Sequence, residues 1–578
     1  MTRKSYLPPF LMLGLALLLT SLASGQEIPT FKEQTPRFPT TYFKHPIQLP
    51  VSMSGDFGEI RSNHFHSGLD LRTGGKEGIK VYAPADGYVS RINISAYGGG
   101  KVLYITHPNG YKTVYMHLSA FCGDIGKVVR RYQYEHQTFT MDINLPPDSL
   151  PVKQGQLVAL TGNTGGSGGP HLHYEIRYAE NDQPINPLYF GVPYSDPITP
   201  TIAGIKLYPA EPSTTLNGKH SSLQLANQTD TVTVAGRFYT GIYAHDGMEK
   251  GSSSRNGVER IELHVDGELF HRYQVPTFLF EDTRGINAII DYAQYRKSRE
   301  YYVLSRQLRG TPGHYSTVYR DNGYLTFGDG EVHRLTYTVS DYKGNTARRT
   351  FYVRGKNAEP TNNALSNVLT GGATAAYFKS FVMQQHGFSL LMEPGTIYDN
   401  DIVTYSASPD GGGLSPLHRI NLQRNPLPPH LPITVRLDIP ENVPAALIAK
   451  LTVVCINGKN LSACPTKRIG DQLEATCRTF GGFALRLDTV APVVKPVNFK
   501  PGQALRGATV KVKISDNLSG IVSYSCYVNG QWELAEHDGK TATLTVDAAC
   551  LRKGSNSITF RATDAVGNTA EQTWKINK

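Results

Sequence analysis

Residues 171–176 read HLHYEI, a run in which polar and apolar side chains alternate. Successive side chains of a β-strand point to opposite faces of the sheet. The polar members, His171, His173 and Glu175, therefore share one face, while the leucine, the tyrosine and the isoleucine point into a core. The stretch predicts a half-buried strand that presents two imidazoles and a carboxylate side by side.

Two other short segments offer donors of the same kind. Residues 66–70 (HSGLD) begin with His66 and end with Asp70 at the start of an apolar strand, and the Ser-Gly pair between them permits a sharp turn. This arrangement can aim an imidazole and a carboxylate at one point. Residues 115–118 (YMHL) end another alternating strand and carry His117.

These donors suit one zinc ion with a hydrolytic role. Zinc hydrolases commonly use three protein ligands and leave the fourth position to water. Two histidines and one aspartate leave a net charge of about +1, which lowers the pKa of bound water and polarises a carbonyl. Further histidines can accept the water proton and stabilise the tetrahedral intermediate. The chain contains no HExxH sequence, which excludes a helix-borne glutamate base, and no CxxC sequence to support a cysteine zinc site.

The composition indicates a long, β-rich chain. At roughly 150 residues per domain, 578 residues make about four domains. Abundant Gly (56) and Pro (36) supply turns, and Tyr (33) and Phe (22) favour strands, so we expect an all-β fold. The net charge of +10 is mild for this length; it suits a polyanionic envelope, and we expect no nucleic-acid partner. Six cysteines suit an oxidising compartment, and Cys526 and Cys550 are one candidate pair.

The N-terminus predicts export. Arg3 and Lys4 precede an apolar run at residues 10–19, and small residues at 23–25 offer a cleavage site. This is the layout of a secretory signal peptide, predicted as residues 1–25. No other stretch approaches the ~20 apolar residues of a membrane helix. We therefore expect no transmembrane segment in the mature chain and a location in the periplasm, the cell envelope or outside the cell.

An internal repeat marks two further domains. Residues 341–347 (DYKGNTA) recur as 564–570 (DAVGNTA), in each case between two strand-like stretches. The simple explanation is two Ig-like β-sandwich domains that end in the same hairpin, whose tight turn suits Asp, Gly and Asn. The predicted parts are, in chain order, the signal peptide 1–25, a zinc metallopeptidase domain 26–195, an Ig-like sandwich 196–356 with an insertion near 275–310, a β-rich domain of uncertain type 357–488, and an Ig-like sandwich 489–578.

Residues 55–190 resemble the lysostaphin-type zinc endopeptidases, a family of cell-wall hydrolases with HxxxD and HxH signatures. Beyond the histidines, several blocks look like family blocks in the family's order. They are residues 68–71 (GLDL), 83–87 (APADG), 115–118 (YMHL), 155–156 (GQ), 162–165 (GNTG) and 169–173 (GPHLH).

The resemblance implies a fold, a site and a substrate. The family's fold is an antiparallel β-sheet with the metal in a groove. By motif, His66, Asp70 and His173 would bind Zn²⁺, and His117 and His171 would be the catalytic histidines, sharing the general-base and oxyanion roles. The family's substrates are the peptide stems and cross-bridges of peptidoglycan. We therefore expect an exported zinc metalloendopeptidase that hydrolyses peptide bonds in peptidoglycan.

Alternatives remain open at this stage. The stretch from Cys122 to Leu150 is longer than a minimal enzyme needs, and one hypothesis is that it overhangs the groove and restrains activity. If the strand is extended, His64 would share a face with His66 and would be a candidate substitute ligand, but the family register favours His66 and predicts an exposed His64. The alternative function is a catalytically restrained wall-binding or regulatory module that recruits other wall hydrolases. A third is an envelope adhesin or scaffold whose C-terminal β domains bind other envelope proteins.

Overall fold

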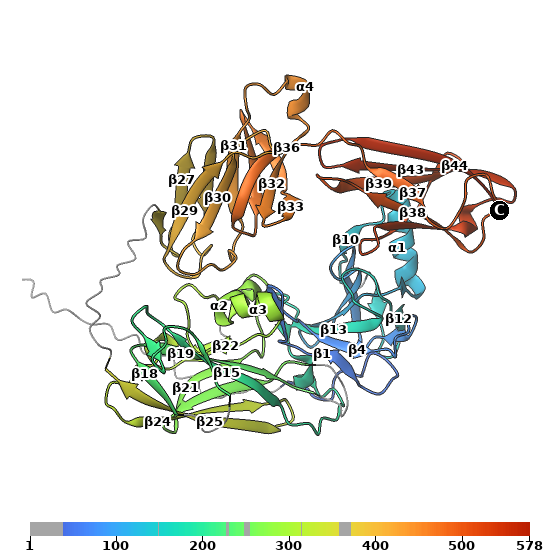
Figure 1. Ribbon diagram of the computed structural model, residues 1–578. Coiled ribbons are helices and arrows are strands. Elements are labelled where there is room, and N and C mark those ends of the chain that lie inside the picture. The colour runs from blue at the N-terminus through green and yellow to red at the C-terminus, as the bar shows by residue number, and fades with distance from the viewer. Residues whose placement is uncertain (1–37, 148, 227–230, 248–254, 314, 358–371) are drawn as a thin grey trace, which may run out of the picture. The chain divides into compact units, whose positions relative to one another are not determined.

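The computed structural model of the chain describes residues 38–147, 149–226, 231–247, 255–313, 315–357 and 372–578. The predicted signal peptide, residues 1–25, lies outside these ranges. Within them the chain is built mainly from antiparallel strands (Figure 1), so the prediction of an all-β fold is confirmed. None of the helices in the described ranges is long and apolar enough to cross a membrane.

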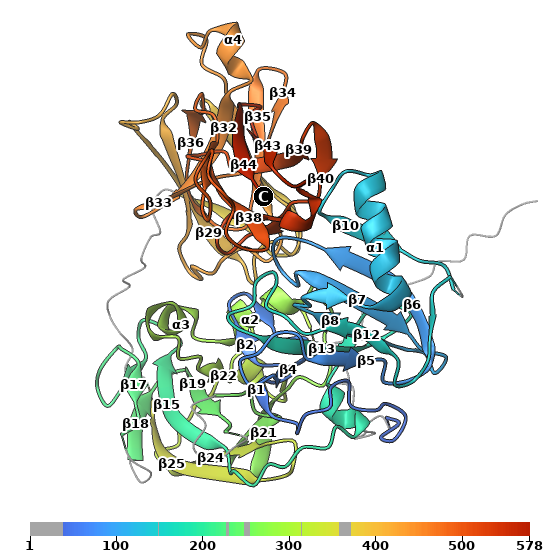
Figure 2. The ribbon, with the colours of Figure 1, turned by 90° about the vertical axis from the view of Figure 1, so that its right-hand side faces the viewer.

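The histidine-bearing strands belong to a nine-stranded sheet, which we call the histidine sheet. Seven strands follow the order β1-β4-β13-β8-β7-β6-β10, with β11 beside β6 and β14 beside β13; Figure 2 shows several of these strands as neighbours. The alternating run at 171–176 forms the first part of β13. The strands are β1 (Met53–Gly55), β4 (Leu69–Arg72), β6 (Gly87–Ile94), β7 (Lys101–Thr106), β8 (Tyr111–Met116), β10 (Met141–Asn144), β11 (Pro151–Val152), β13 (His171–Tyr178) and β14 (Pro184–Ile185).

Smaller elements complete this region. A three-stranded sheet runs in the order β5-β12-β9, and β2 pairs with β3 in a hairpin just before His66. The Cys122–Leu150 stretch contains one helix, α1, and one strand, β10, and β11 begins directly after it. β10 pairs with β6 at the far edge of the histidine sheet, and three strands separate it from β13. These elements are β2 (Ile60–Arg61), β3 (His64–Phe65), β5 (Lys80–Tyr82), β9 (Ala120–Phe121), α1 (Gly123–Glu135) and β12 (Leu157–Leu160).

Residues before the site share a core with the strands that follow this region. Phe57, Ile60 and Phe65 are buried in one apolar cluster with strands of residues 201–356. The ring of Phe65 packs edge-on against Tyr315, with centroids 4.8 Å apart. Because Phe65 directly precedes His66, this shared core helps to fix the position of His66.

Residues 201–356 form a two-sheet sandwich, which we call the first sandwich. Strands of both sheets contribute to one apolar core, and two short helices, α2 (Ile286–Ile289) and α3 (Tyr292–Ser298), interrupt the strands. The sheet orders are β17-β15-β19-β22 and β16-β18-β25-β24-β20-β21-β23. The strands are β15 (Thr201–Pro209), β16 (Thr215–Leu216), β17 (Leu223–Gln224), β18 (Thr231–Ala235), β19 (Phe238–His245), β20 (Arg260–Val265), β21 (Glu268–Gln274), β22 (Val303–Leu304), β23 (Ser316–Val318), β24 (Val332–Ser340) and β25 (Thr346–Lys356).

The last sandwich repeats this plan on a smaller scale. Its two sheets run β37-β38-β42-β41 and β40-β39-β43-β44 and enclose one apolar core. The repeated sequence forms the turn between β24 and β25 in the first sandwich and between β43 and β44 in the last. The strands are β37 (Val493–Pro496), β38 (Thr509–Ser515), β39 (Ile521–Val528), β40 (Gln531–Glu533), β41 (Glu536–Asp538), β42 (Thr543–Asp547), β43 (Ser555–Asp564) and β44 (Thr569–Asn577).

Between the two sandwiches, residues 372–487 form two further sheets around their own core. Their orders are β26-β29-β30-β36-β32-β33 and β27-β28-β31-β35-β34. All six cysteines of the chain are described and are free thiols, including the candidate pair Cys526 and Cys550. The elements are β26 (Gly372–Ala375), β27 (Phe381–Gln385), β28 (Phe388–Met392), β29 (Asp401–Ser408), β30 (Leu417–Leu422), β31 (Ile433–Asp438), α4 (Ala445–Ile448), β32 (Leu451–Asn457), β33 (Asn460–Ala463), β34 (Thr466–Ile469), β35 (Gln472–Cys477) and β36 (Gly481–Leu487).

Candidate functional site

The register of neighbouring strands brings the predicted donors together. β13 pairs antiparallel with β4, and His173 lies directly opposite Asp70. On its other side β13 pairs with β8, with His173 opposite Met116, so that His117 follows at the end of β8. His66 comes from the short connection between β3 and β4. The donors predicted from separate segments thus meet where β4, β13 and β8 lie side by side.

Gly68 allows this convergence because the chain passes closely against β13 there. A Cβ atom at position 68 would lie 2.4 Å from the carbonyl oxygen of Tyr174 and 2.8 Å from Cγ of Glu175. Contacts that short leave no room for a side chain, so only glycine fits without displacement. The Ser-Gly pair that the sequence suggests as a turn is therefore also a point of close approach.

Three buried donor atoms form the centre of the site, and we call their residues, His66, Asp70 and His173, the His–Asp–His trio. Nε2 of His66 lies 3.0 Å from Oδ1 of Asp70 and 2.9 Å from Nδ1 of His173. The remaining distance, from Nδ1 of His173 to Oδ1 of Asp70, is 2.9 Å. Tetrahedral zinc with bonds of about 2.0–2.1 Å spaces its ligands about 3.3 Å apart. The trio therefore fits a zinc ion after shifts of a few tenths of an ångström.

The hydrogen bonds behind the two imidazoles fix which nitrogen carries the proton. Nδ1 of His66 lies 2.6 Å from the carbonyl oxygen of Asp56. A carbonyl oxygen only accepts, so Nδ1 must donate and Nε2 keeps its lone pair for the centre of the trio. Nε2 of His173 lies 2.8 Å from Oε1 of Glu175, a carboxylate oxygen that only accepts, so Nε2 carries a proton and Nδ1 is the nitrogen that faces the centre of the trio. Such outer carboxylate and carbonyl partners are typical of histidines that bind metals.

Two arginines support the carboxylates from outside the trio. Oδ2 of Asp70, the oxygen that points away from the centre, accepts a hydrogen bond of 2.7 Å from Arg61. Glu175 is fully buried, and its second oxygen accepts from Nε of Arg177. Oε1 of Glu175 also accepts a 2.6 Å bond from the hydroxyl of Ser67. Both carboxylates are thereby held ionised and in one orientation.

The pKa values of the trio favour a positive ion between its members. Burial opposes the charge of Asp70, but interaction with His66 and hydrogen bonds from the histidines hold the pKa of Asp70 well below its usual range. Burial lowers the pKa of His66 to about 4, so this imidazole is neutral at neutral pH. Burial also works against charge on His173, yet its hydrogen bonds to Asp70 and Glu175 raise the pKa of His173 to about 9. The two carboxylates thus attract positive charge to this point.

Two further histidines stand beside the trio. Their ring centroids are 4.8 Å apart, and Nε2 of His171 lies 3.3 Å from Oδ1 of Asp70. Nδ1 of His117 lies 2.9 Å from the carbonyl oxygen of Thr164, and Nδ1 of His171 lies 2.8 Å from that of Gly169. Both Nδ1 atoms therefore donate, which leaves Nε2 of each ring as the nitrogen available for proton transfer. Burial, together with the charges of His173 and His171, lowers the pKa of His117 to about 3, so it is neutral and able to accept a proton.

His117 adopts a backbone conformation that is unusual for a residue with a side chain. Its φ of 63° lies in the left-handed region, which non-glycine residues rarely occupy. The residue directly follows β8, and its amide donates to the carbonyl oxygen of Gly99 at 2.8 Å. This conformation turns the chain out of the strand at the point where His117 faces His171. Left-handed residues of this kind cluster at functional sites.

The other histidines of the region lie elsewhere. His64 is exposed, and its Nδ1 contacts the carbonyl oxygen of Ser62, so it takes no part in the trio. His107 is buried between the carbonyl of Asp86 and the hydroxyl of Thr113, and His136 stacks on Tyr132 at the surface.

Apart from Glu175, the supporting residues were not found from the sequence. Asp56 acts through its backbone carbonyl, which carries no residue-specific signal. Arg61 and Arg177 reach the site only through folding, although Arg177 follows Glu175 on the same strand face and could have been paired with it by alternation. Glu175 itself belongs to the alternating run, and the structure places it against His173.

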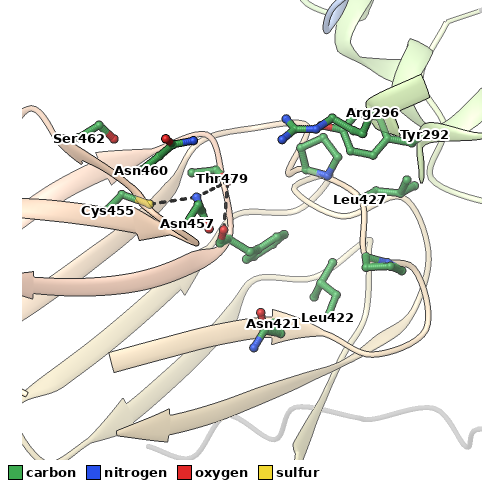
Figure 3. Close-up of a pocket in the computed structure, with 13 residues that line it drawn as sticks. Tyr292, Arg296, Asn421, Leu422, Leu427, Cys455, Asn457, Asn460, Ser462 and Thr479 are labelled. Atoms are coloured by element: carbon green, nitrogen blue, oxygen red, sulfur yellow. Dashed lines mark hydrogen bonds between the residues drawn. The ribbon is translucent and has the colours of Figure 1, made fainter. Parts of the chain in front are cut away.

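A cleft in the sheets of residues 372–487 has a different character (Figure 3). The side chains that residues 372–487 contribute to its lining are uncharged. Nδ2 of Asn457 donates to Oγ1 of Thr479 at 3.3 Å and contacts Sγ of Cys455 at 3.5 Å. Asn460 and Ser462 lie along the neighbouring strand. These side chains offer no acid–base pair comparable to the histidines, and we assign no chemistry to the cleft.

The comparisons with known proteins agree with the geometry of this region. Residues 64–134 and 142–187 match Peptidase family M23, which confirms the resemblance to lysostaphin-type enzymes, and residues 373–488 match the Zu5-like domain. An uncharacterized metalloprotease of Haemophilus influenzae is 32% identical over 158 residues, which are 26% of this chain and 28% of that protein.

Two further relatives carry more specific names. The DD-carboxypeptidase/endopeptidase Mpg of Neisseria meningitidis serogroup B is 31% identical over 155 residues, 27% of this chain and 26% of that protein. The peptidoglycan DD-endopeptidase ShyA of Vibrio cholerae is 31% identical over 161 residues, 27% of this chain and 31% of that protein. The chain thus spans less than a third of the length of each of these curated relatives.

Proposed function

We propose that the chain is an exported zinc metalloendopeptidase that hydrolyses peptide bonds in the stems or cross-bridges of peptidoglycan. One observation carries the proposal most directly. Three donor atoms, Nε2 of His66, Oδ1 of Asp70 and Nδ1 of His173, lie within 3.0 Å of one another, and two more histidines stand beside them. The names of the M23 relatives support the substrate class.

The mechanism follows from the direction in which each nitrogen points. His66, Asp70 and His173 would hold the zinc ion, which when bound supplies Lewis acidity to a water and to the scissile carbonyl. Nε2 of His117 or of His171 accepts a proton from the attacking water, because Nδ1 of each ring is already engaged with a backbone carbonyl. The second imidazole stabilises the negative charge that develops on the carbonyl oxygen.

The protein supplies orientation as well as proton transfer. The carbonyl groups of Thr164 and Gly169 hold the rings of His117 and His171, so neither has to be ordered during the reaction. Glu175 holds the ring of His173 and increases its basicity as a ligand. Arg61 occupies the outer oxygen of Asp70 and leaves the inner oxygen for the metal.

The remaining parts of the proposal concern the rest of the chain. We keep the predicted bounds: the signal peptide 1–25, the peptidase domain 26–195 and the three β domains that follow, of which the first and last are Ig-like. Peptidoglycan is the proposed substrate, and other envelope proteins are the proposed partners of the β domains. Since Phe57 and Phe65 share a core with the first sandwich, experiments should use the full mature chain and not residues 26–195 alone.

The test compares the full mature chain with its His173→Ala variant. Bound zinc is measured by elemental analysis, and both proteins are incubated with purified sacculi, whose released fragments are identified by mass. The proposal predicts near-stoichiometric zinc and new peptide termini for the wild type and neither for the variant. His64→Ala is the matched control, because His64 is exposed and outside the trio. Zinc without cleavage would favour the restrained module, and the absence of both would overturn the proposal.

A further inference from the structure

Three buried aspartates come together at the start of the first sandwich, far from the histidines in sequence. Asp196 precedes β15, Asp246 directly follows β19, and Asp341 begins the turn between β24 and β25. One carboxylate oxygen from each lies within 4.8 Å of those of the other two. All three residues are buried, and Asp246 is only 1% exposed. Three carboxyl groups therefore share a space from which water is largely excluded.

Two oxygens of this cluster have no hydrogen-bond partner. Oδ1 of Asp246 and Oδ2 of Asp196 are buried and have no hydrogen-bond partner. The two residues are themselves at least nine-tenths buried, so water cannot easily reach these oxygens. Within the described ranges none of the three carboxylates forms an ion pair. The nearby ammonium group of Lys343 lies 4.1 Å above the ring of Tyr194. A buried carboxylate without a partner is strongly unfavourable, so the free oxygens call for a cation.

The rest of the cluster is held firmly in place. Oδ1 of Asp341 accepts from the amides of Lys343 and Asn345 at 2.8 and 2.9 Å, and Oδ2 accepts from Nδ2 of Asn345 at 2.7 Å. The same Nδ2 donates to the carbonyl oxygen of Asp196 at 3.0 Å. Oδ1 of Asp196 accepts from the amide of Ile198 at 3.1 Å. These bonds orient the carboxylates and leave the unpartnered oxygens for a ligand.

The last sandwich contains the same arrangement at the same three places. Asp488 precedes β37, Asp516 follows β38 and Asp564 ends β43, and their oxygens also lie within 4.8 Å of one another. Nδ2 of Asn568 donates to Oδ2 of Asp564 at 2.7 Å and to the carbonyl oxygen of Asp488 at 2.9 Å, as Asn345 does in the first sandwich. Oδ1 of Asp516 is again buried without a partner.

The repeated turn sequence alone does not explain why an aspartate trio occurs in both sandwiches. The repeated sequence accounts for Asp341 and Asp564, because an Asp-x-x-Gly-Asn turn uses that carboxylate for its own amides. It does not require the other two aspartates, which come from separate segments. A carboxylate trio that forms twice from three separated segments, each time with a free buried oxygen, points to a common ligand.

We propose that each aspartate trio binds one Ca²⁺ ion, and that the ion links the segment entering a sandwich to the last hairpin of that sandwich. Calcium takes oxygen ligands at about 2.3–2.6 Å, so ligands on opposite sides of the ion are up to about 5 Å apart, which agrees with the spacing found here. Zinc favours nitrogen and sulfur ligands. Magnesium requires shorter bonds and keeps most of its water.

Each ion would act on stability and not on the hydrolytic step. Asp196 and Asp488 lie on the entering segments, while Asp341 and Asp564 lie on the closing hairpins. Binding neutralises the repulsion among the carboxylates and adds a link between the two ends of each sandwich. Extracellular modules bind calcium with a Kd of about 0.1–1 mM, which indicates the range to search.

The test is a calorimetric titration of the zinc-loaded full chain with CaCl₂, with Asp246→Asn, Asp516→Asn and the double variant alongside. We expect about two ions for the wild type, one for each single variant and none for the double variant. Asp471→Asn, at an exposed position, is the matched control and keeps both ions. Binding by the double variant equal to the wild type, or no binding by the wild type, would overturn the proposal. Displacement of calcium by equimolar MgCl₂ would overturn the choice of ion.

Thermal unfolding separates a ligand site from a purely structural cluster. Calcium should raise the Tm of the wild type by about 5 °C or more and leave the Tm of the double variant unchanged. In calcium-free buffer the double variant should be as stable as the wild type or more stable, because asparagine removes the repulsion. If the Tm of the double variant lies below that of the wild type by the same amount with and without calcium, the aspartates are only structural and the proposal is contradicted.

Discussion

The His–Asp–His trio and the aspartate trio of the first sandwich are both buried three-residue clusters, but they differ in how their charge is balanced. In the first, two imidazoles share one carboxylate, whose outer oxygen is paired with Arg61. In the second, three carboxylates face one another with free oxygens at Asp196 and Asp246. The comparison indicates that the protein alone can organise the nitrogen-rich site, whereas the proposed calcium site would gain stability from its ion.

The largest expected effect comes from removing metal. Chelation should abolish cleavage of sacculi, because the His–Asp–His trio supplies no Lewis acid of its own. Zinc should restore cleavage and calcium should not, whereas calcium and not zinc should restore the Tm lost by the sandwiches. The measurement is fragment release and thermal unfolding after each addition. Recovery of cleavage with calcium alone would break the distinction between the two trios.

A smaller loss is expected from the histidines beside the trio. His117→Ala and His171→Ala should each lower kcat by about 10²–10⁴-fold while zinc content stays near that of the wild type, because these residues transfer protons and do not hold the ion. His136→Ala, at an exposed site, is the control. Loss of zinc from His171→Ala would mean that it is a ligand, since its Nε2 lies only 3.3 Å from Asp70.

A change at Glu175, whose carboxylate holds the ring of His173, should have a smaller effect than the loss of either catalytic histidine. Glu175→Gln keeps the size of the side chain but removes the charge that orients His173, and we expect zinc affinity to fall by about 10–100-fold. Competition with a zinc-binding dye measures this change. Glu180→Gln at an exposed position should leave the affinity unaltered. An unchanged affinity in Glu175→Gln would show that the backbone alone positions His173.

The smallest effect concerns the packing beneath the trio. Gly68→Ala should lower the free energy of unfolding by about 1–3 kcal/mol, because its Cβ would meet the carbonyl oxygen of Tyr174 at 2.4 Å. Gly411→Ala, where nothing lies within 4 Å of the added atom, is the control. Denaturant unfolding of both variants gives the difference. Equal stability would mean that β4 and β13 can separate without loss.

The sequence predicted one trio and not the other for a physical reason. Strand alternation within 171–176 and the short spacing of 66–70 bring donors together before any tertiary contact is known, and the family resemblance then selects His66, Asp70 and His173 among them. Residues 196, 246 and 341 meet only through the sandwich topology, and the repeat revealed just one of the three. The supporting arginines and the carbonyl of Asp56 could not be predicted either, because they too reach the site only through the tertiary fold.

In the fold, too, features set by neighbouring residues could be predicted, whereas contacts between distant residues could not. Alternation and turn residues predicted the strands, and the repeated turn identified the closing hairpins. Helix α1 was missed, although Ile125 and Val129 recur at helical spacing on its buried face. The core that Phe57 and Phe65 share with the first sandwich could not be predicted, because an apolar residue does not specify which neighbour will cover it.

The most direct test of the account is one metal analysis of three full-length chains, each equilibrated with zinc and calcium together. The chains are the wild type, His173→Ala and the Asp246→Asn/Asp516→Asn double variant. The account predicts that His173→Ala loses zinc and keeps calcium, and that the double variant loses calcium and keeps zinc. Loss of both metals from either variant, or of neither, would contradict the assignment of two sites with different chemistry.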